Sequence, residues 1–180
     1  MAVKLPRTIR LDPSDMFVFT RAAEPGEWAV TGTFLFSGAD PSAFGAKERQ
    51  AFRAGFLGVE SFGWSTLVIV SEASAEERAS AFELLGRQLI EHCGAPDRAS
   101  ALVAAEEELA FAESLCAHPP GTLLGLHRSA EEGAIRESFR TLHRRPDRLT
   151  PMSAFQFVEV ENDEPGEEVD LHSLMKDKGS

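Results

Sequence analysis

Cysteine and histidine are the residue types in this sequence best suited to metal binding or nucleophilic catalysis. Four of them form two short groups, His92–Cys93 and Cys116–x–His118, and each group lies at the end of a predicted helix. If the two helices pack antiparallel, the groups lie at opposite ends, whereas zinc needs its ligands within about 2.0–2.3 Å of one ion. The spacing therefore predicts two buried thiols at helix C-termini, with a metal site through Cys93, Cys116 and neighbouring histidines as the alternative.

A cysteine nucleophile would need a general base, for which His127 and His143 are available. Reactive thiols favour helix N-termini, whereas the dipole at a helix C-terminus disfavours the thiolate. The sequence also lacks the motifs Gly-x-Ser-x-Gly, Gly-x4-Gly-Lys-Ser/Thr, Gly-x-Gly-x2-Gly and His-Glu-x2-His. We therefore assign no catalytic residue, no metal ligand and no cofactor from the sequence.

A segment rich in glycine and aromatic residues covers positions 54–65. Its glycines alternate with Phe56, Phe62 and Trp64, directly before a predicted buried strand. Glycines allow backbone to approach a ligand closely, and aromatic rings line many pockets. The same pattern fits a tight connection whose rings fill the core, and this is the commoner case. Both interpretations stay open, with Phe56, Phe62 and Trp64 as the ligand-binding candidates.

Basic residues concentrate near the predicted C-terminal strands, at Arg136, Arg140, Arg144, Arg145 and Arg148. Arg136 and Arg140 share a side in a helix and in a strand, so we expect a small cationic patch. Such a patch could bind an anionic ligand, an acidic partner or the acidic tail of this chain, and charge runs are also often merely solvated. Arg136 and Arg140 complete the set of candidate ligand-binding residues.

The elements that must position these residues begin with strands. Residues 8–11 alternate between polar and apolar, and β-rich runs at 16–20 and 28–36 flank a Pro–Gly turn at 24–26. Two such runs across a turn predict an N-terminal hairpin.

A helix is predicted next. Asp40 followed by proline is typical of a helix N-terminus, and Phe44, Phe52 and Phe56 recur at multiples of four. Residues 64–70 then have the β-branched density of a buried strand.

The central helices have the clearest signals. Ser74 and Glu77 match a capping box, and Gly94 lies where a left-handed C-terminal cap would fall. Proline at 96 prevents continuation, so a second helix is predicted over 97–117. The short connection predicts an antiparallel helical hairpin.

Two further strands are predicted near the C-terminus, at 122–127 and 152–160. Residues 129–142 fit two structures: a helix begun by a capping box, or a strand after a tight turn at Gly133. We favour the turn, because glycine would weaken the first turns of a helix. The sequence thus predicts an α+β fold, with a mainly antiparallel sheet, an N-terminal hairpin, central helices and a C-terminal strand meander. One globular domain is expected over 1–160, followed by an acidic flexible tail over 161–180.

Composition excludes several classes of protein. The chain has 180 residues, with 18 Lys and Arg against 29 Asp and Glu, and a formal net charge of -11. No apolar run is long enough to cross a membrane, and the first residues lack the apolar core of a secretory signal. The acidity argues against nucleic-acid binding, although much of it lies in the tail. Two cysteines form no disulfide framework, so we expect reduced thiols in a soluble, cytoplasmic protein.

Several stretches resemble an uncharacterised bacterial family of unknown function, across nearly the whole chain. They are residues 5–15, 22–28, 55–67 and 133–142. Members of that family are associated with genes for molybdopterin-dependent, formate-dehydrogenase-like oxidoreductases and their accessory proteins. The resemblance implies an accessory or maturation role, and it assigns no site residue.

Two functional hypotheses are compatible with the sequence. The leading hypothesis is an accessory or interaction protein without catalysis of its own, whose partner is another protein, such as a larger metalloenzyme. The alternative is a domain or enzyme that binds a small anionic molecule in a pocket near residues 55–64. Neither a nucleic acid nor a membrane is expected as a partner, and formation of a homo-oligomer is left open.

Overall fold

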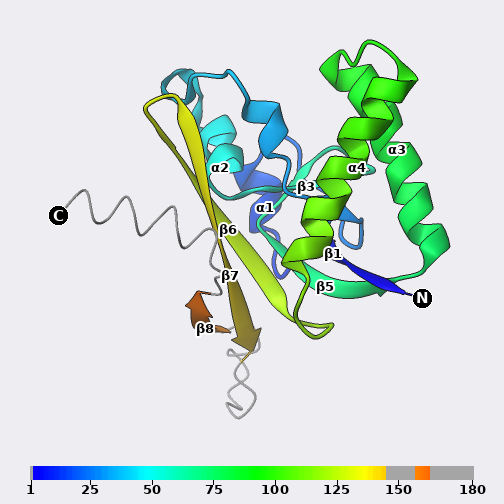
Figure 1. Cartoon of the computed structure of the whole chain (residues 1–180). Helices are drawn as coiled ribbons and strands as arrows, with labels where there is room; N and C mark the ends of the chain where they lie inside the picture. Colours follow the sequence, from blue (N-terminus) through cyan, green and yellow to red (C-terminus); the bar gives the residue numbers. More distant parts are fainter. Residues whose placement is uncertain (1, 145–156, 163–180) are drawn as a thin grey trace.

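The computed structural model describes residues 2–144 and 157–162, which form an α+β fold with two antiparallel sheets (Figure 1). The main sheet has five strands in the order β1-β5-β6-β7-β8. Their bounds are β1 (Val3–Ile9), β5 (Leu67–Ala73), β6 (Leu123–Glu131), β7 (Ala134–Arg144) and β8 (Phe157–Asn162). Alternation in β5 places Val68 and Val70 in the core, as its β-branched sequence predicts.

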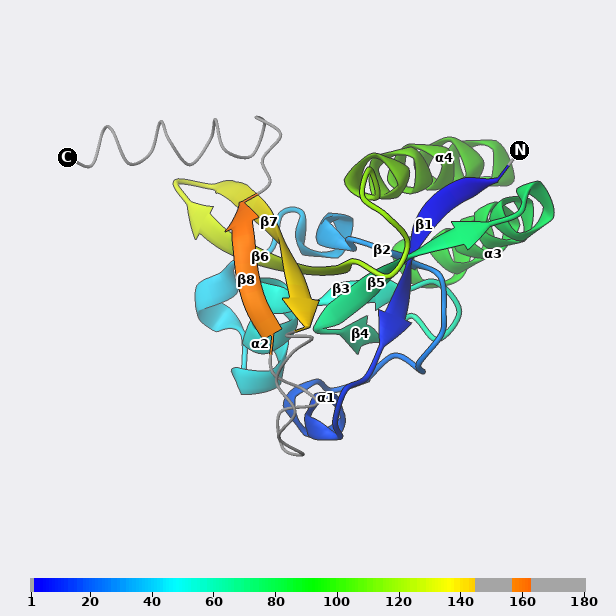
Figure 2. The ribbon, with the colours of Figure 1, turned by 90° about the horizontal axis from the view of Figure 1, so that it is seen from below.

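Two long helices, α3 (Ala75–Cys93) and α4 (Arg98–Leu115), form the predicted hairpin. Ser74 accepts a hydrogen bond from the Glu77 backbone while the Glu77 side chain accepts one from the Ser74 backbone, and Gly94 is left-handed with φ of 71°. The helices approach closely at Gly86, where an added Cβ would lie 2.7 Å from Leu102. Figure 2 shows the hairpin near the start of β1, whereas α1 follows the other end of that strand.

A smaller sheet joins β2 (Ala29–Val30), β3 (Phe56–Gly58) and β4 (Trp64–Ser65). Short helical elements surround it: α1 (Ser14–Val18), η1 (Thr33–Phe36), η2 (Pro41–Ala43) and α2 (Ala46–Ala54). None of the helices in the described part of the chain is both long and apolar enough to span a bilayer.

The predicted N-terminal hairpin is wrong. Most of its first run is the helix α1, and its second run divides into β2, which pairs with β3, and the 3-10 helix η1. A long-range contact favours α1, because the buried Asp15 carboxylate accepts hydrogen bonds from the backbone and hydroxyl of Thr66. Gly32, with φ of 79°, turns the chain into η1.

The helix predicted after Asp40 is interrupted. Asp40 caps the short helix η2, the backbone is extended at Phe44, and α2 then runs only to Ala54. Phe56 consequently lies in β3 rather than on the helix. The predicted strand at 64–70 is also divided, since Thr66, which binds Asp15, separates β4 from β5.

The C-terminal strand meander is confirmed by β6, β7 and β8. Between β6 and β7, Glu132 and Gly133 have φ of 52° and 80°, so a tight turn replaces the alternative helix. β8 covers the end of the predicted strand at 152–160 and extends to Asn162. Residues 152–156 and 163–180 lie outside the described residues.

Candidate functional site

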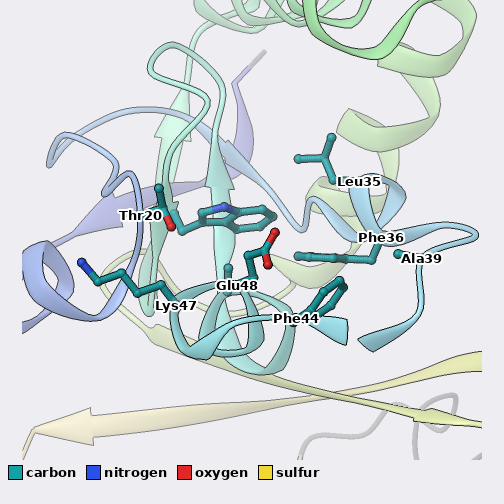
Figure 3. Close-up of a pocket in the computed structure, with 9 residues that line it drawn as sticks. Thr20, Leu35, Phe36, Ala39, Phe44, Lys47 and Glu48 are labelled. Carbon is teal, nitrogen blue, oxygen red and sulfur yellow. The ribbon is translucent and has the colours of Figure 1, made fainter. Parts of the chain in front are cut away.

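An open groove of about 440 Å³ lies between α2 and the segment that contains η1 (Figure 3). Three aromatic rings, three small or aliphatic side chains and three polar side chains line it: Phe36, Phe44 and Trp64; Leu35, Ala39 and Ala51; Thr20, Lys47 and Glu48. We call this feature the Trp64 groove. A hollow with a mainly apolar lining and a few polar groups is the usual form of a binding site.

The aromatic rings of the groove are held by one another. Phe36 stacks on Trp64 with ring centroids 5.3 Å apart, and it meets Phe52 edge to face at 5.2 Å. Phe44 also packs against both phenylalanines at 5.9 Å. Such pairs fix the ring positions, so the groove is formed before any ligand arrives.

Gly55 permits the position of Trp64. A Cβ at Gly55 would lie 2.8 Å from Trp64 Cε3 and 3.0 Å from the Ala51 carbonyl oxygen. A glycine of the predicted glycine–aromatic segment therefore does allow a close approach. The group that approaches is an aromatic side chain of this chain.

Behind the groove, Arg128 of β6 is completely buried. Its guanidinium donates to the carbonyls of Phe52 (2.9 Å) and Ala51 (3.2 Å) in the last turn of α2, and to the carbonyl of Thr31. It also lies 5.3 Å from the centre of the Phe36 ring. Arg128 thus joins β6 to both walls of the Trp64 groove, and it is a positioning residue for that groove.

Two carboxylates accompany this buried cation. Glu137 of β7 lies 3.5 Å from the Arg128 guanidinium and accepts a hydrogen bond from the Thr33 hydroxyl. Burial lowers the pKa of Arg128 to about 10, against the opposing effect of Glu137, so it remains charged at neutral pH. Burial raises the pKa of Glu108 on α4 to about 7, and the charge of Glu137 adds to this effect.

This buried ionic group was not among the predicted sites. A signal was available, because Arg128 continues the alternation of Leu124 and Leu126 along β6 and therefore points toward the same face. A charged residue on the buried face of a strand needs partners inside the protein. Nothing in the sequence identifies those partners.

The five predicted site residues do not form one site. Trp64 lines the groove, whereas Phe56 is fully buried in the core and Phe62 stacks on His92 at 5.0 Å. Arg136 pairs with Glu131 at 3.2 Å, and Arg140 lies exposed on β7. Of the five, only Trp64 is among the residues that line the groove.

A model of a family of unknown function, DUF6505, matches residues 1–160 of the chain. The chain belongs to the DUF6505 family. This confirms the resemblance to an uncharacterised family. No curated protein and no solved structure matches the chain.

In this DUF6505 protein, the two cysteines lie at the C-termini of α3 and α4. Cys93 is exposed and Cys116 is buried, so the prediction of two buried thiols is wrong for Cys93, which lies at the exposed tip of the helical hairpin. Burial raises the pKa of Cys116 to about 12. Within residues 2–144 and 157–162, no three His, Cys, Asp or Glu side chains form a group that could hold a metal ion.

Glu27 of this DUF6505 protein is a further buried carboxylate, and its contacts are structural. It accepts backbone hydrogen bonds from Glu24, Glu60 and Ser61 at 2.7–2.9 Å. A side chain at Gly58 would overlap this carboxylate. Glu27 thus fastens two loops together, and it borders a smaller cleft of about 190 Å³ beside α3.

Proposed function

We propose that this protein is an accessory or interaction protein, without catalysis of its own, that binds a partner protein through the Trp64 groove. The observation that carries the proposal is the apolar and aromatic lining of that open groove. Aromatic side chains in pockets at the centre of an interface contribute much of the binding energy in many complexes. Lys47 and Glu48 would belong to a polar rim.

Exposed apolar side chains next to the groove support the same proposal. Met16 and Phe17 on α1 are 51% and 68% exposed, and α1 packs against α2. Thr20, two residues after α1, lines the groove. The groove and these two side chains together form what we call the α1–groove surface. Exposed apolar surface of this kind is common where proteins bind one another.

The family resemblance suggests the first partner to test. It implies an accessory role beside a molybdopterin-dependent, formate-dehydrogenase-like oxidoreductase, a larger metalloenzyme. In such an assembly, an apolar side chain of the partner would fill the groove and α1 would contact the surrounding surface.

Native capture with matched variants tests this proposal. The tagged full chain is compared with Phe17→Ser, with Ala39→Trp, which fills the groove, and with Val103→Ser on α4 as the control. Val103 is also exposed, at 61%, but lies on another element. We expect a partner bound by the wild type and the control, and reduced about tenfold or more with the first two variants. Equal capture by all four chains would contradict the proposal.

Binding of a small anionic molecule in the same groove is the second candidate. Lys47 favours it, because this cation lines the groove and forms no ion pair with any residue that the structure describes. Titration with benzoate, followed by tryptophan fluorescence, would test this function. Lys47→Ala should weaken a genuine site while Arg136→Ala leaves it unchanged, since Arg136 does not line the groove.

A further inference from the structure

The helix that forms one wall of the Trp64 groove carries unneutralised positive charge. Lys47, Arg49 and Arg53 of α2 are exposed, and within the described residues none of them forms an ion pair. Arg49 donates to the Phe44 carbonyl at 2.9 Å. The Glu48 carboxylate accepts from the Gly45 backbone at 3.1 Å and so caps the start of α2.

This wall differs from the surfaces on which arginines are neutralised by glutamates. Arg78, Arg98 and Arg136 are each paired with glutamates at 2.5–3.2 Å. The whole chain carries a net charge of -11. Figure 3 shows the Lys47 side chain extended beside Thr20, away from the Phe36 and Phe44 rings. An acidic segment with apolar side chains would therefore match both the cations of α2 and the aromatic lining.

The direction of β8 leads toward the groove end of the β6–β7 hairpin. β8 runs antiparallel to β7, from the partner position of Arg144 to that of Arg140, so the chain leaves it toward the start of β7. There Ile135 packs against the cluster that contains Phe36 and Phe52. Figure 1 shows this end of the β6–β7 hairpin beside α2. Positions 135 and 140 are five residue steps apart in the strand, a distance of about 17 Å.

The sequence after β8 has the required chemistry. Five acidic residues and no basic residue occur between positions 163 and 170. Leu171, Leu174 and Met175 follow, at the spacing that places side chains on one face of a helix. Eight residues can span up to about 27 Å when extended, so Leu171 can reach beyond the position of Ile135.

We propose that segment 163–175 binds the Trp64 groove of its own chain. Leu171, Leu174 and Met175 contact the aromatic lining, and the preceding carboxylates face Lys47, Arg49 and Arg53. A covalently attached segment has an effective concentration of about a millimolar, so it occupies even a weak site. The segment excludes a partner until the partner displaces it. This inference rests on the proposed function of the groove and adds its regulation.

Quenching of Trp64 fluorescence by acrylamide tests the contact. The chain has two tryptophans, so Trp28→Phe in the full chain leaves Trp64 as the single reporter. In this background we compare the triple variant Leu171→Ser/Leu174→Ser/Met175→Ser with Val103→Ser. The triple variant should raise the quenching constant about twofold because Trp64 loses its cover, and the control should not. Equal quenching in all three chains, with unchanged circular dichroism, would overturn the proposal.

Carbodiimide cross-linking gives a second measurement on the full chain. Peptide mapping should join the Lys47 amine to a carboxylate between positions 163 and 170, and the triple variant should lose this product. A mixture of ¹⁵N-labelled and unlabelled chains distinguishes links within a chain from links between copies. Links only between copies, or none to Lys47, would overturn the proposal. Partner capture by the triple variant separates the two ideas. Capture should exceed that of the wild type if the segment competes for the groove, should equal it if the groove binds a partner but not the segment, and should be absent if the groove binds no partner.

Discussion

At the scale of single residues, Arg128 has the largest structural effect on the Trp64 groove. Its guanidinium donates to Thr31 and Thr33 beside η1 and to two carbonyls in the last turn of α2, while Glu137 balances its charge. Helix ends leave carbonyls without intrahelical partners, and a buried cation is stable only with such partners. One side chain thus donates hydrogen bonds to the free carbonyls at the end of α2 and fixes the two walls of the groove.

Replacing Arg128 should therefore destabilise the whole protein. Arg128→Met leaves the Glu137 carboxylate without its cation, and we expect a loss of about 3 kcal/mol in the free energy of unfolding. Urea denaturation followed by circular dichroism measures it. Arg53→Met, at an exposed position, should change the same quantity by less than about 0.5 kcal/mol. The double variant Arg128→Met/Glu137→Gln should recover part of the loss, and strict additivity would contradict the assigned pairing.

Glu108 predicts a dependence of stability on pH. The pKa of its side chain is raised from 4.5 to about 7, chiefly by burial, so the folded state holds this proton more tightly than the unfolded state. The stabilisation of the folded state by this bound proton is fully present below pH 4.5 and is lost as the pH rises through 7. The wild type should then be less stable than Glu108→Gln at pH 8, by up to about 3 kcal/mol, and similar to it at pH 4.5. A constant difference between the two across this range would refute the shift.

At the scale of elements, the groove depends on close packing between α2 and β4. The position after α2 must be glycine because the Trp64 ring lies against its backbone. The helical hairpin has its own local caps, at Ser74 and Asp97, which take no part in this contact. Trp64 does pack against the core cluster that contains Leu85 and Leu109. Changes at the end of α2 should consequently alter the groove more than the caps of α3 and α4.

Gly55→Ala tests this packing. The added methyl would lie 2.8 Å from the Trp64 ring, so the ring or the end of α2 must move. We expect a loss of about 1–3 kcal/mol in unfolding free energy and a shift in tryptophan emission. Gly45→Ala, at the other end of α2, is the matched control because no atom lies within 4 Å of its added Cβ. An equally small effect at both positions would show that the groove is not tightly packed there.

At the scale of the whole molecule, charge is divided unevenly. The acidic residues between positions 159 and 170 account for much of the net charge, whereas α2 carries Lys47, which lines the groove, and the exposed Arg49 and Arg53. The α1–groove surface is therefore apolar with a cationic border. It suits an anionic amphipathic group better than a neutral one.

Anilinonaphthalene sulfonate, an aromatic anion, is a suitable probe of this surface. Its fluorescence on binding should be stronger with the triple variant Leu171→Ser/Leu174→Ser/Met175→Ser than with the wild type, because the proposed internal competitor is weakened. Adding Ala39→Trp to the triple variant should abolish the gain, since it fills the groove. Dye binding that is insensitive to Ala39→Trp would place the dye elsewhere.

The sequence by itself determined the elements whose hydrogen bonds are local. The Ser74–Glu77 capping box, the left-handed Gly94 and the turn at Gly133 each involve residues within a few positions of one another. Their chemistry is complete within the local sequence, so the helical hairpin followed from it, and the β6–β7 hairpin was the favoured one of two structures. Trp64 was likewise a candidate, because an aromatic residue among glycines is unusual in any context.

Only the tertiary structure decided the secondary structure of the N-terminal region and which residues form the site. α1 is held by Asp15 bonded to Thr66, and Arg128 is bonded to carbonyls 76 and 77 positions away. These partners are distant in sequence, so no local pattern distinguishes the helix from a strand or identifies the groups that bind the buried arginine. The groove exists because α2, η1 and β4 pack around Trp64. Buried polar contacts hold these elements together, and the energy of such contacts depends on the burial that the folded structure creates.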